Sequence, residues 1–195
     1  MPILKTALFL FLTYLILIAP QGCGNKYGVE MRSIDSLIVK NKTALDYLNI
    51  DLVTIDERRK EMKGQIAVLN KVKPDTSGLE FAMNFDKYKG IYKIYNRFIE
   101  NYDVIFNRVR FNEKQLNNLK NSVKDEKIRG AEFKLILEKE NENVTQNLAN
   151  AETFGHTISQ LEPEYQRVSL YFDQQVKALI KQFPELLSVL KENSI

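Results

Sequence analysis

The stretch from Met31 to Leu69 reads MRSIDSLIVKNKTALDYLNIDLVTIDERRKEMKGQIAVL, and it decides the expected fold. Its apolar residues recur at alternating steps of three and four, along two rows. The first row is Met31, Ile38, Leu45, Leu52 and Ile66, and the second is Ile34, Leu48, Ile55, Met62 and Leu69. A sustained alternation of this kind is typical of helices that pack as coiled coils. We therefore expect one long helix here, on the order of 60 Å at 1.5 Å per residue.

Two polar residues interrupt these rows. Asn41 and Arg59 stand at positions where the repeat calls for an apolar side chain. A polar residue at such a position either fixes the register of helix pairing or lies at a solvent-facing edge. The sequence leaves both interpretations open.

Two more periodic segments follow the first. The turn-forming stretch from Lys73 to Gly78 separates it from a helix expected over about Leu79 to Val123, which is apolar on two sides and should contact two neighbours. A third segment begins near Phe133 and continues past Pro163 in one phase. A proline ends or kinks a helix, so we expect either a kink or a restart on the same axis. Pro184 should open a short last helix.

Three periodic segments of similar length, joined by short links, favour antiparallel neighbours. The expected fold is all-α: an elongated antiparallel bundle of three long helices with coiled-coil-like packing. The number becomes four if the third helix is broken at Pro163.

The beginning of the chain has a different character. Lys5 precedes an apolar run of 13 residues from Ala7 to Ala19, broken only by Thr13 and Tyr14. A charged start, a short apolar run and a small residue before the cut are typical of an export signal. A membrane-spanning helix needs about 20 apolar residues, so an uncleaved anchor is the weaker interpretation.

The segment Ala19-Pro20-Gln21-Gly22-Cys23 resembles the lipobox of bacterial lipoproteins, although Pro20 stands where that class usually has an aliphatic residue. The resemblance covers only the leader. It implies cleavage before Cys23 and attachment of diacylglycerol, with acyl chains such as palmitate, to its thiol. Gly24 replaces the aspartate linked to inner-membrane retention, which implies the outer membrane if the host has one. An ordinary secretory signal is the alternative.

The domain organisation follows from these two parts. We expect a signal peptide over residues 1–22, a lipidated tether over 23–30 and a helical-bundle domain over 31–195. The protein would then reside in the cell envelope, held to a membrane by its lipid.

Composition argues against several classes of function. Lys and Arg number 28 against 25 Asp and Glu, for a net charge of +3, and no basic block stands out. A nucleic-acid partner is therefore not expected. Cys23 and His156 are the only cysteine and histidine. One cysteine cannot form a disulfide framework, and one histidine cannot supply a His₃ or His₂Glu zinc site. A Cys–His pair would need Cys23, which the leader already uses. We expect no enzyme, no metal and no cofactor.

An aromatic row is the most distinctive feature of the mature chain: Tyr88, Tyr92, Tyr95, Phe98, Tyr102 and Phe106. Such a row either forms core knobs whose hydroxyls reach a polar partner, or forms a surface that binds a partner helix, peptide or glycan.

Together these features predict a lipid-anchored envelope protein whose bundle acts as a non-enzymatic scaffold or protein-interaction module, with a protein partner or self-association. The alternative is a carrier or sensor that binds a small or lipidic ligand between its helices. An enclosed apolar pocket of several hundred Å³ beside the row would favour the carrier, and a solid core would favour the scaffold.

Overall fold

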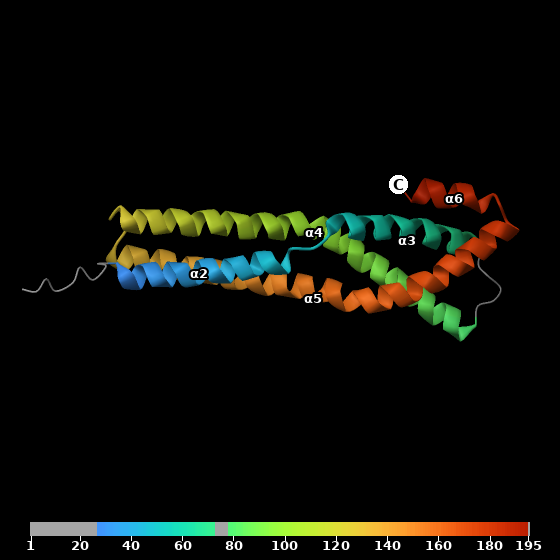
Figure 1. Cartoon of the computed structure of the whole chain (residues 1–195), viewed down its shortest axis with the longest axis horizontal. Coiled ribbons are helices and arrows are strands. Elements are labelled where there is room, and N and C mark those ends of the chain that lie inside the picture. Colours follow the sequence, from blue (N-terminus) through green and yellow to red (C-terminus); the bar gives the residue numbers. More distant parts are fainter. Residues whose placement is uncertain (1–26, 73–77, 195) are drawn as a thin grey trace, which may run out of the picture.

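The computed structural model describes residues 27–72 and 78–194, which form an elongated bundle of helices (Figure 1). In chain order the helices are α2 (Gly28–Tyr47), α3 (Leu52–Val72), α4 (Leu79–Lys124), α5 (Gly130–Gln182) and α6 (Leu186–Asn193). The expected all-α bundle is confirmed, with α4 running back along α5. The leader, Cys23 and residues 73–77 of the expected first break lie outside the described residues.

A strict seven-residue repeat governs the buried side of α4. One set of buried positions is Phe81, Tyr88, Tyr95, Tyr102, Val109, Leu116 and Val123, and the other is Asn84, Ile91, Phe98, Asn112 and Leu119. Two core positions per seven residues are the signature of coiled-coil packing. Other aromatic and aliphatic residues of the predicted stripe flank this seam and are half-buried: Phe85, Tyr92, Ile99 and Phe106.

The first expected helix is two helices in the structure, which corrects the prediction of one continuous helix from Met31 to Leu69. The chain leaves α2 after Tyr47 and enters α3 at Leu52. Leu48 and Ile55, on either side of the link, are both buried. The apolar rows therefore continue through the break, and periodicity alone could not reveal it.

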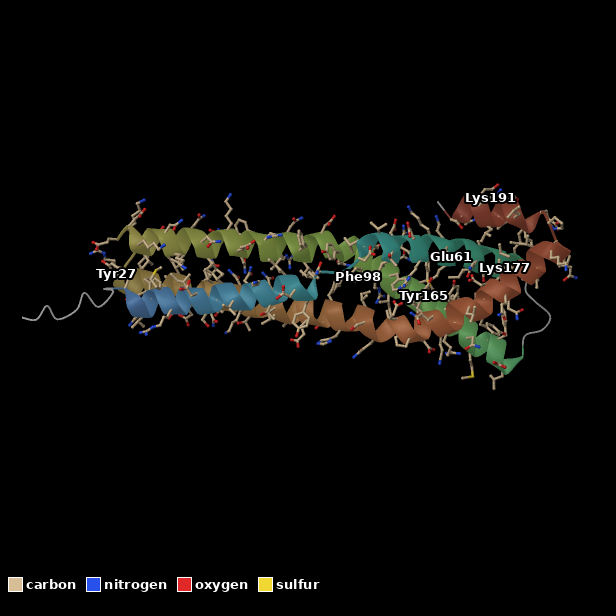
Figure 2. The ribbon with its side chains drawn as sticks, viewed as in Figure 1. Tyr27, Glu61, Phe98, Tyr165, Lys177 and Lys191 are labelled. Atoms are coloured by element: carbon tan, nitrogen blue, oxygen red, sulfur yellow. The ribbon has the colours of Figure 1, made fainter. Side chains whose placement is uncertain are left out.

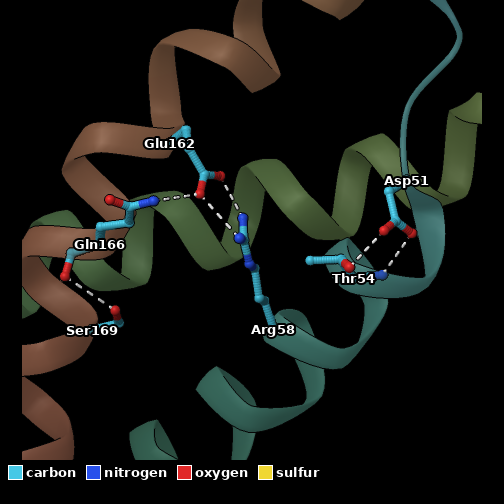
Figure 3. Close-up of polar contacts among 6 residues, drawn as sticks. All are labelled: Asp51, Thr54, Arg58, Glu162, Gln166 and Ser169. Carbon is cyan, nitrogen blue, oxygen red and sulfur yellow. Dashed lines mark hydrogen bonds and ion pairs between the residues drawn. The ribbon is translucent and has the colours of Figure 1, made fainter.

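Two polar contacts stabilise this break. The Asp51 carboxylate caps α3, accepting hydrogen bonds from the Thr54 backbone N–H at 3.1 Å and from the Thr54 hydroxyl at 2.7 Å (Figure 3). The Tyr102 hydroxyl of α4 donates to the backbone carbonyl of Leu48 at 2.7 Å. The first contact satisfies a donor at the start of α3, and the second an acceptor at the end of α2.

Pro163 neither ends α5 nor turns the chain back, because the helix continues from Gly130 to Gln182. Figure 1 shows α5 bending in its C-terminal part, and a proline inside a helix is a known cause of a bend. Tyr165 and Phe172 keep the seven-residue spacing set by Val144 and Ala151, and all four are buried. The fourth packed segment comes from the break before α3.

The bundle has two halves of different composition. In one half α2, α4 and α5 contact one another, and in the other α3 and α6 join α4 and α5. The short last helix expected after Pro184 is confirmed as α6, whose Leu186 is buried.

Three buried asparagines form a polar layer in the three-helix half: Asn41 of α2, Asn112 of α4 and Asn147 of α5. In each helix the asparagine lies between a residue of the Leu37–Leu116–Val144 cluster and one of the larger core containing Ala44, Val109 and Ala151. The Asn41 amide donates to the Val109 carbonyl at 3.1 Å.

The burial of Asn41 decides between its two interpretations. With 1% of its surface exposed, Asn41 is no solvent-facing residue, which favours the register interpretation. Arg59 differs, because it is half-buried and reaches Asn96 of α4 at 3.3 Å from the rim of the bundle.

Close helix contact explains the position of Gly64. A Cβ atom there would lie 2.8 Å from the Leu190 carbonyl oxygen and would overlap the Ser194 hydroxyl. Gly64 therefore lets α6 pack directly on α3. Gly90, in α4, has no atom within 4 Å of such a Cβ.

We expect Gly64→Ala to displace α6 and to destabilise the protein by about 1–3 kcal/mol, as overpacking does. Hydrogen exchange of residues 186–194 should accelerate. Gly90→Ala is the matched control and should stabilise the protein by about 0.5–1 kcal/mol, because alanine is the better helix former. Unchanged protection of α6 in Gly64→Ala would contradict the α3–α6 contact.

We expect Tyr102→Phe to lower the free energy of unfolding by about 1 kcal/mol, since it removes the hydrogen bond to Leu48 while keeping the ring. Urea denaturation measures the change. Tyr92→Phe is the control, because the Tyr92 hydroxyl bonds to no described residue. Equal stability of the two variants would exclude a role for Tyr102 at the break.

Candidate functional site

The structure places most of the aromatic row in the core. Tyr88 and Tyr95 are each 1% exposed, Phe98 is 3% exposed and Tyr102 is 9% exposed. Tyr92 and Phe106 are half-buried and are the two members with appreciable accessible surface. A partner or ligand surface on this row stays a prediction, and it would depend on those two residues.

Ring contacts explain why the row is buried. Phe98 stacks on Phe154 of α5 with ring centroids 4.9 Å apart. About one turn away along α4, Tyr95 meets Tyr165 at 5.8 Å, and about three turns away Tyr88 meets Phe172 at 4.9 Å. Aromatic pairs at such distances add stabilisation beyond the area they bury. Figure 2 shows Phe98 and Tyr165 between the helices of the bundle.

The hollow beside Tyr102 is a groove open to solvent. Its volume is about 430 Å³, and its walls include Asp56, Lys60 and Asp103 as well as Ile99. It therefore lacks the enclosed, apolar character expected of a carrier's pocket.

A polar cluster joins α3, α4 and α5 around Gln65, which is 4% exposed. The Tyr88 hydroxyl donates to the Gln65 side-chain oxygen at 2.5 Å. The Gln65 amide nitrogen donates in turn to the Asp173 carboxylate, and to Glu61 at 3.2 Å. The partners of Gln65 lie on α3 itself (Glu61), on α4 (Tyr88) and on α5 (Asp173). This side chain therefore links the three helices.

Burial and charge set the protonation of this cluster. Burial raises the pKa of the Tyr88 hydroxyl, which therefore stays a donor. Partial burial raises the pKa of Glu61, and the neighbouring Asp173 carboxylate raises it further, while Lys177 opposes both. Figure 2 labels Glu61 on α3 and Lys177 on α5.

The surface next to the cluster is a groove of about 410 Å³ where acids and bases alternate, with Lys60 and Lys177 beside Glu57, Glu61 and Asp173. Such mixed charge produces no strong field of one sign. Within residues 27–72 and 78–194, no group of three or more His, Cys, Asp or Glu side chains is arranged to hold a metal ion.

A second interaction ties α3 to α5 beside Pro163 (Figure 3). The Arg58 guanidinium makes two hydrogen bonds to the Glu162 carboxylate, one of them at 3.0 Å, and lies 4.6 Å from the centre of the Tyr165 ring. Gln166 also donates to Glu162, at 2.9 Å. A bidentate pair combined with cation–π stacking is stronger than a single surface ion pair.

These contacts and burial shift the pKa values of three groups. The Arg58 guanidinium lowers the pKa of Glu162, and Glu162 raises that of Arg58. Burial raises the pKa of Tyr165 to about 12. All three groups therefore keep one charge state across the neutral range, which suits a structural clamp.

His156 lies on the surface of α5, apart from this clamp. Its Nε2 atom is 3.7 Å from a Glu152 carboxylate oxygen, and its ring centre is 5.4 Å from that of Tyr47. This is the arrangement of a locally paired surface side chain. The expectation that the chain is not an enzyme stays a prediction.

Little in the sequence predicts the polar cluster around Gln65. Buried tyrosines require polar partners, so an acceptor near Tyr88 could be expected. Gln65 stands next to a core row and not in it, and Asp173 comes from a distant segment. Nothing in the spacing pairs Arg58 with Glu162.

Comparisons with known proteins provide no relative: no family model, curated protein or solved structure matches this chain. Among the described residues, no helix combines the length and the hydropathy that a membrane span requires.

We expect Glu61→Gln to stabilise the protein by about 0.5 kcal/mol at pH 7, a value discounted for solvent screening. A raised pKa in the folded state means that ionising Glu61 opposes folding. This penalty grows as the pH rises from the unfolded pKa, near 4.3, through the folded one. The gain should therefore disappear below about pH 4.

Thermal melts of Glu61→Gln between pH 3 and 8 measure this gain. Glu57→Gln is the control, because Glu57 lines the same groove without a hydrogen bond to Gln65. A stabilisation that is equal at pH 3 and pH 7 would exclude the ionisation mechanism.

Proposed function

We propose that this chain is a lipid-anchored bacterial cell-envelope protein whose helical bundle is a non-enzymatic scaffold for protein partners. The lipobox-like segment ending at Cys23 carries this proposal, because it implies a lipid on the Cys23 thiol. Only three residues separate Cys23 from Tyr27, where the described bundle begins.

The short separation has a geometric consequence. Four residue steps span at most about 14 Å, so a lipid on Cys23 would hold the Tyr27 end of the bundle close to the membrane. Figure 2 labels Tyr27 at one end of the bundle and Lys191 of α6 toward the other. The 53 residues of α5 correspond to about 80 Å of helix. An anchored chain would therefore present its helices over a long distance from the membrane.

Accessible apolar side chains support the role of an interaction module. Such side chains occur on α2, α3, α4 and α5, and examples with at least 58% of their surface exposed are Val39, Val53, Leu79, Phe111, Leu135 and Leu170. Apolar groups left in solvent gain free energy when a partner covers them.

The core favours the scaffold over the carrier. The aromatic row that would line a ligand cavity packs against α3 and α5, and the hollow beside it is open and charged. In α2 and α3 one of the two apolar rows, the one from Ile34 to Leu69, is buried within one chain, and the other, from Met31 to Ile66, is half-buried. That use of the rows disfavours self-association through them.

The anchor is tested by the intact mass of the N-terminal peptide from membrane-extracted protein. We expect a peptide that starts at Cys23 and carries the added mass of diacylglycerol. Cys23→Ala should abolish this mass and release the protein from the membrane fraction, whereas Gly24→Ala, the matched control, should keep both. An unmodified N-terminus beyond Cys23, or an intact leader, would overturn the proposal.

A further inference from the structure

The three-helix half of the bundle has an open groove between α2 and α5. Its volume is about 630 Å³, and its apolar lining consists of Val29 and Leu37 of α2 and Leu137 of α5. On α2 the lining residues run from Val29 to Lys40 at alternating steps of three and one. This stretch covers three helical turns, or about 16 Å.

The other half of the bundle shows how such a surface is covered. There α6 packs on α3 and touches α5, and its Leu186 is 3% exposed. In the three-helix half, α2, α4 and α5 pack together without a fourth described helix. The α2–α5 groove is thus long enough to hold a short helix, and it lies in the half of the bundle that α6 does not cover.

The charge around the groove specifies what would fit it. Arg32 and Lys40 of α2 and Lys134 of α5 line it, against a single acid, Glu138. None of these three cations forms an ion pair with a described residue. Apolar walls with an unneutralised basic rim complement an amphipathic helix whose apolar stripe is flanked by acidic residues.

We propose that the α2–α5 groove binds an amphipathic helix of a partner protein that has Glu or Asp beside its apolar stripe. The partner helix takes the place that α6 takes in the other half and completes a four-helix arrangement. The apolar stripe contacts Val29, Leu37 and Leu137, and the acidic residues pair with the basic rim. This inference deepens the proposed scaffold function by naming the class of partner.

The test uses the full chain, both as extracted from membranes and as Cys23→Ala, so that binding is measured with and without the anchor. The probe is a labelled helical peptide of about 14 residues, with a Leu/Ala stripe flanked by Glu. A second peptide has Lys in place of each Glu. Fluorescence anisotropy measures binding, and we expect the acidic peptide to bind at least about tenfold more tightly, with added salt reducing the difference.

Two variants of the protein locate the binding site. Arg32→Gln/Lys40→Gln/Lys134→Gln should weaken binding of the acidic peptide about tenfold. The matched control, Lys93→Gln/Lys114→Gln/Lys181→Gln, removes the same charge at exposed positions outside the groove and should leave binding unchanged.

A third variant tests the groove itself. Ser36→Trp fills the groove with a large side chain and should abolish binding, while circular dichroism verifies that the helices are intact.

Several outcomes would overturn the assignment. These are no binding of the acidic peptide, equal binding of the two peptides, or equal loss in the groove and control triple variants. Binding of anionic phosphatidylglycerol vesicles through the three cations without peptide binding would assign the groove to lipid. A dimer in sedimentation that Ser36→Trp dissociates would assign it to a second copy. Failure here with a lipid found on Cys23 rejects the groove alone, and peptide binding without that lipid rejects the anchor alone.

Discussion

The structure depends on one seven-residue register that α4 keeps for its whole length. Because the core positions recur without a slip from Phe81 to Val123, α4 can pack on α2 in one half of the bundle and on α3 in the other. α5 keeps the same spacing on both sides of Pro163. The exposed position of the proline explains this tolerance, since its ring and the missing hydrogen bond face solvent and not the seam.

The two halves use polar groups in different ways. In the half with α3, Gln65 satisfies the Tyr88 hydroxyl and links it to Asp173, so aromatic rings can fill the core without an unpaired hydroxyl. In the half with α2, the core side chains are smaller and an asparagine layer interrupts them. Such a layer costs stability but disfavours other alignments of the helices. The asparagines thereby specify the alignment of α2, α4 and α5 in the half of the bundle whose small core side chains distinguish least between alternative alignments.

Much of this fold is predictable from the sequence, because a seven-residue apolar repeat specifies helices and their buried sides. The bounds of α4 and the short α6 follow from apolar spacing and from proline positions. The break after Tyr47 was missed, because the link of four residues preserves the repeat and its signal is the single capping residue Asp51. The contact between Arg58 of α3 and Glu162 of α5 cannot be predicted from the sequence for another reason. Both are charged residues outside the apolar rows, and only the packed fold brings them together.

The break between α2 and α3 also determines how the molecule bears mechanical load. A pull on Tyr27 along the axis of the bundle shears α2 against α4 and α5, and the Asn41–Val109 hydrogen bond and the burial of Leu48 resist it. If α2 detaches, α3 still has its own cap at Asp51 and its own clamp from Arg58 to Glu162. Unravelling therefore has a natural stopping point at residue 51, and the contacts of α3 with α4, α5 and α6 can outlast the loss of α2.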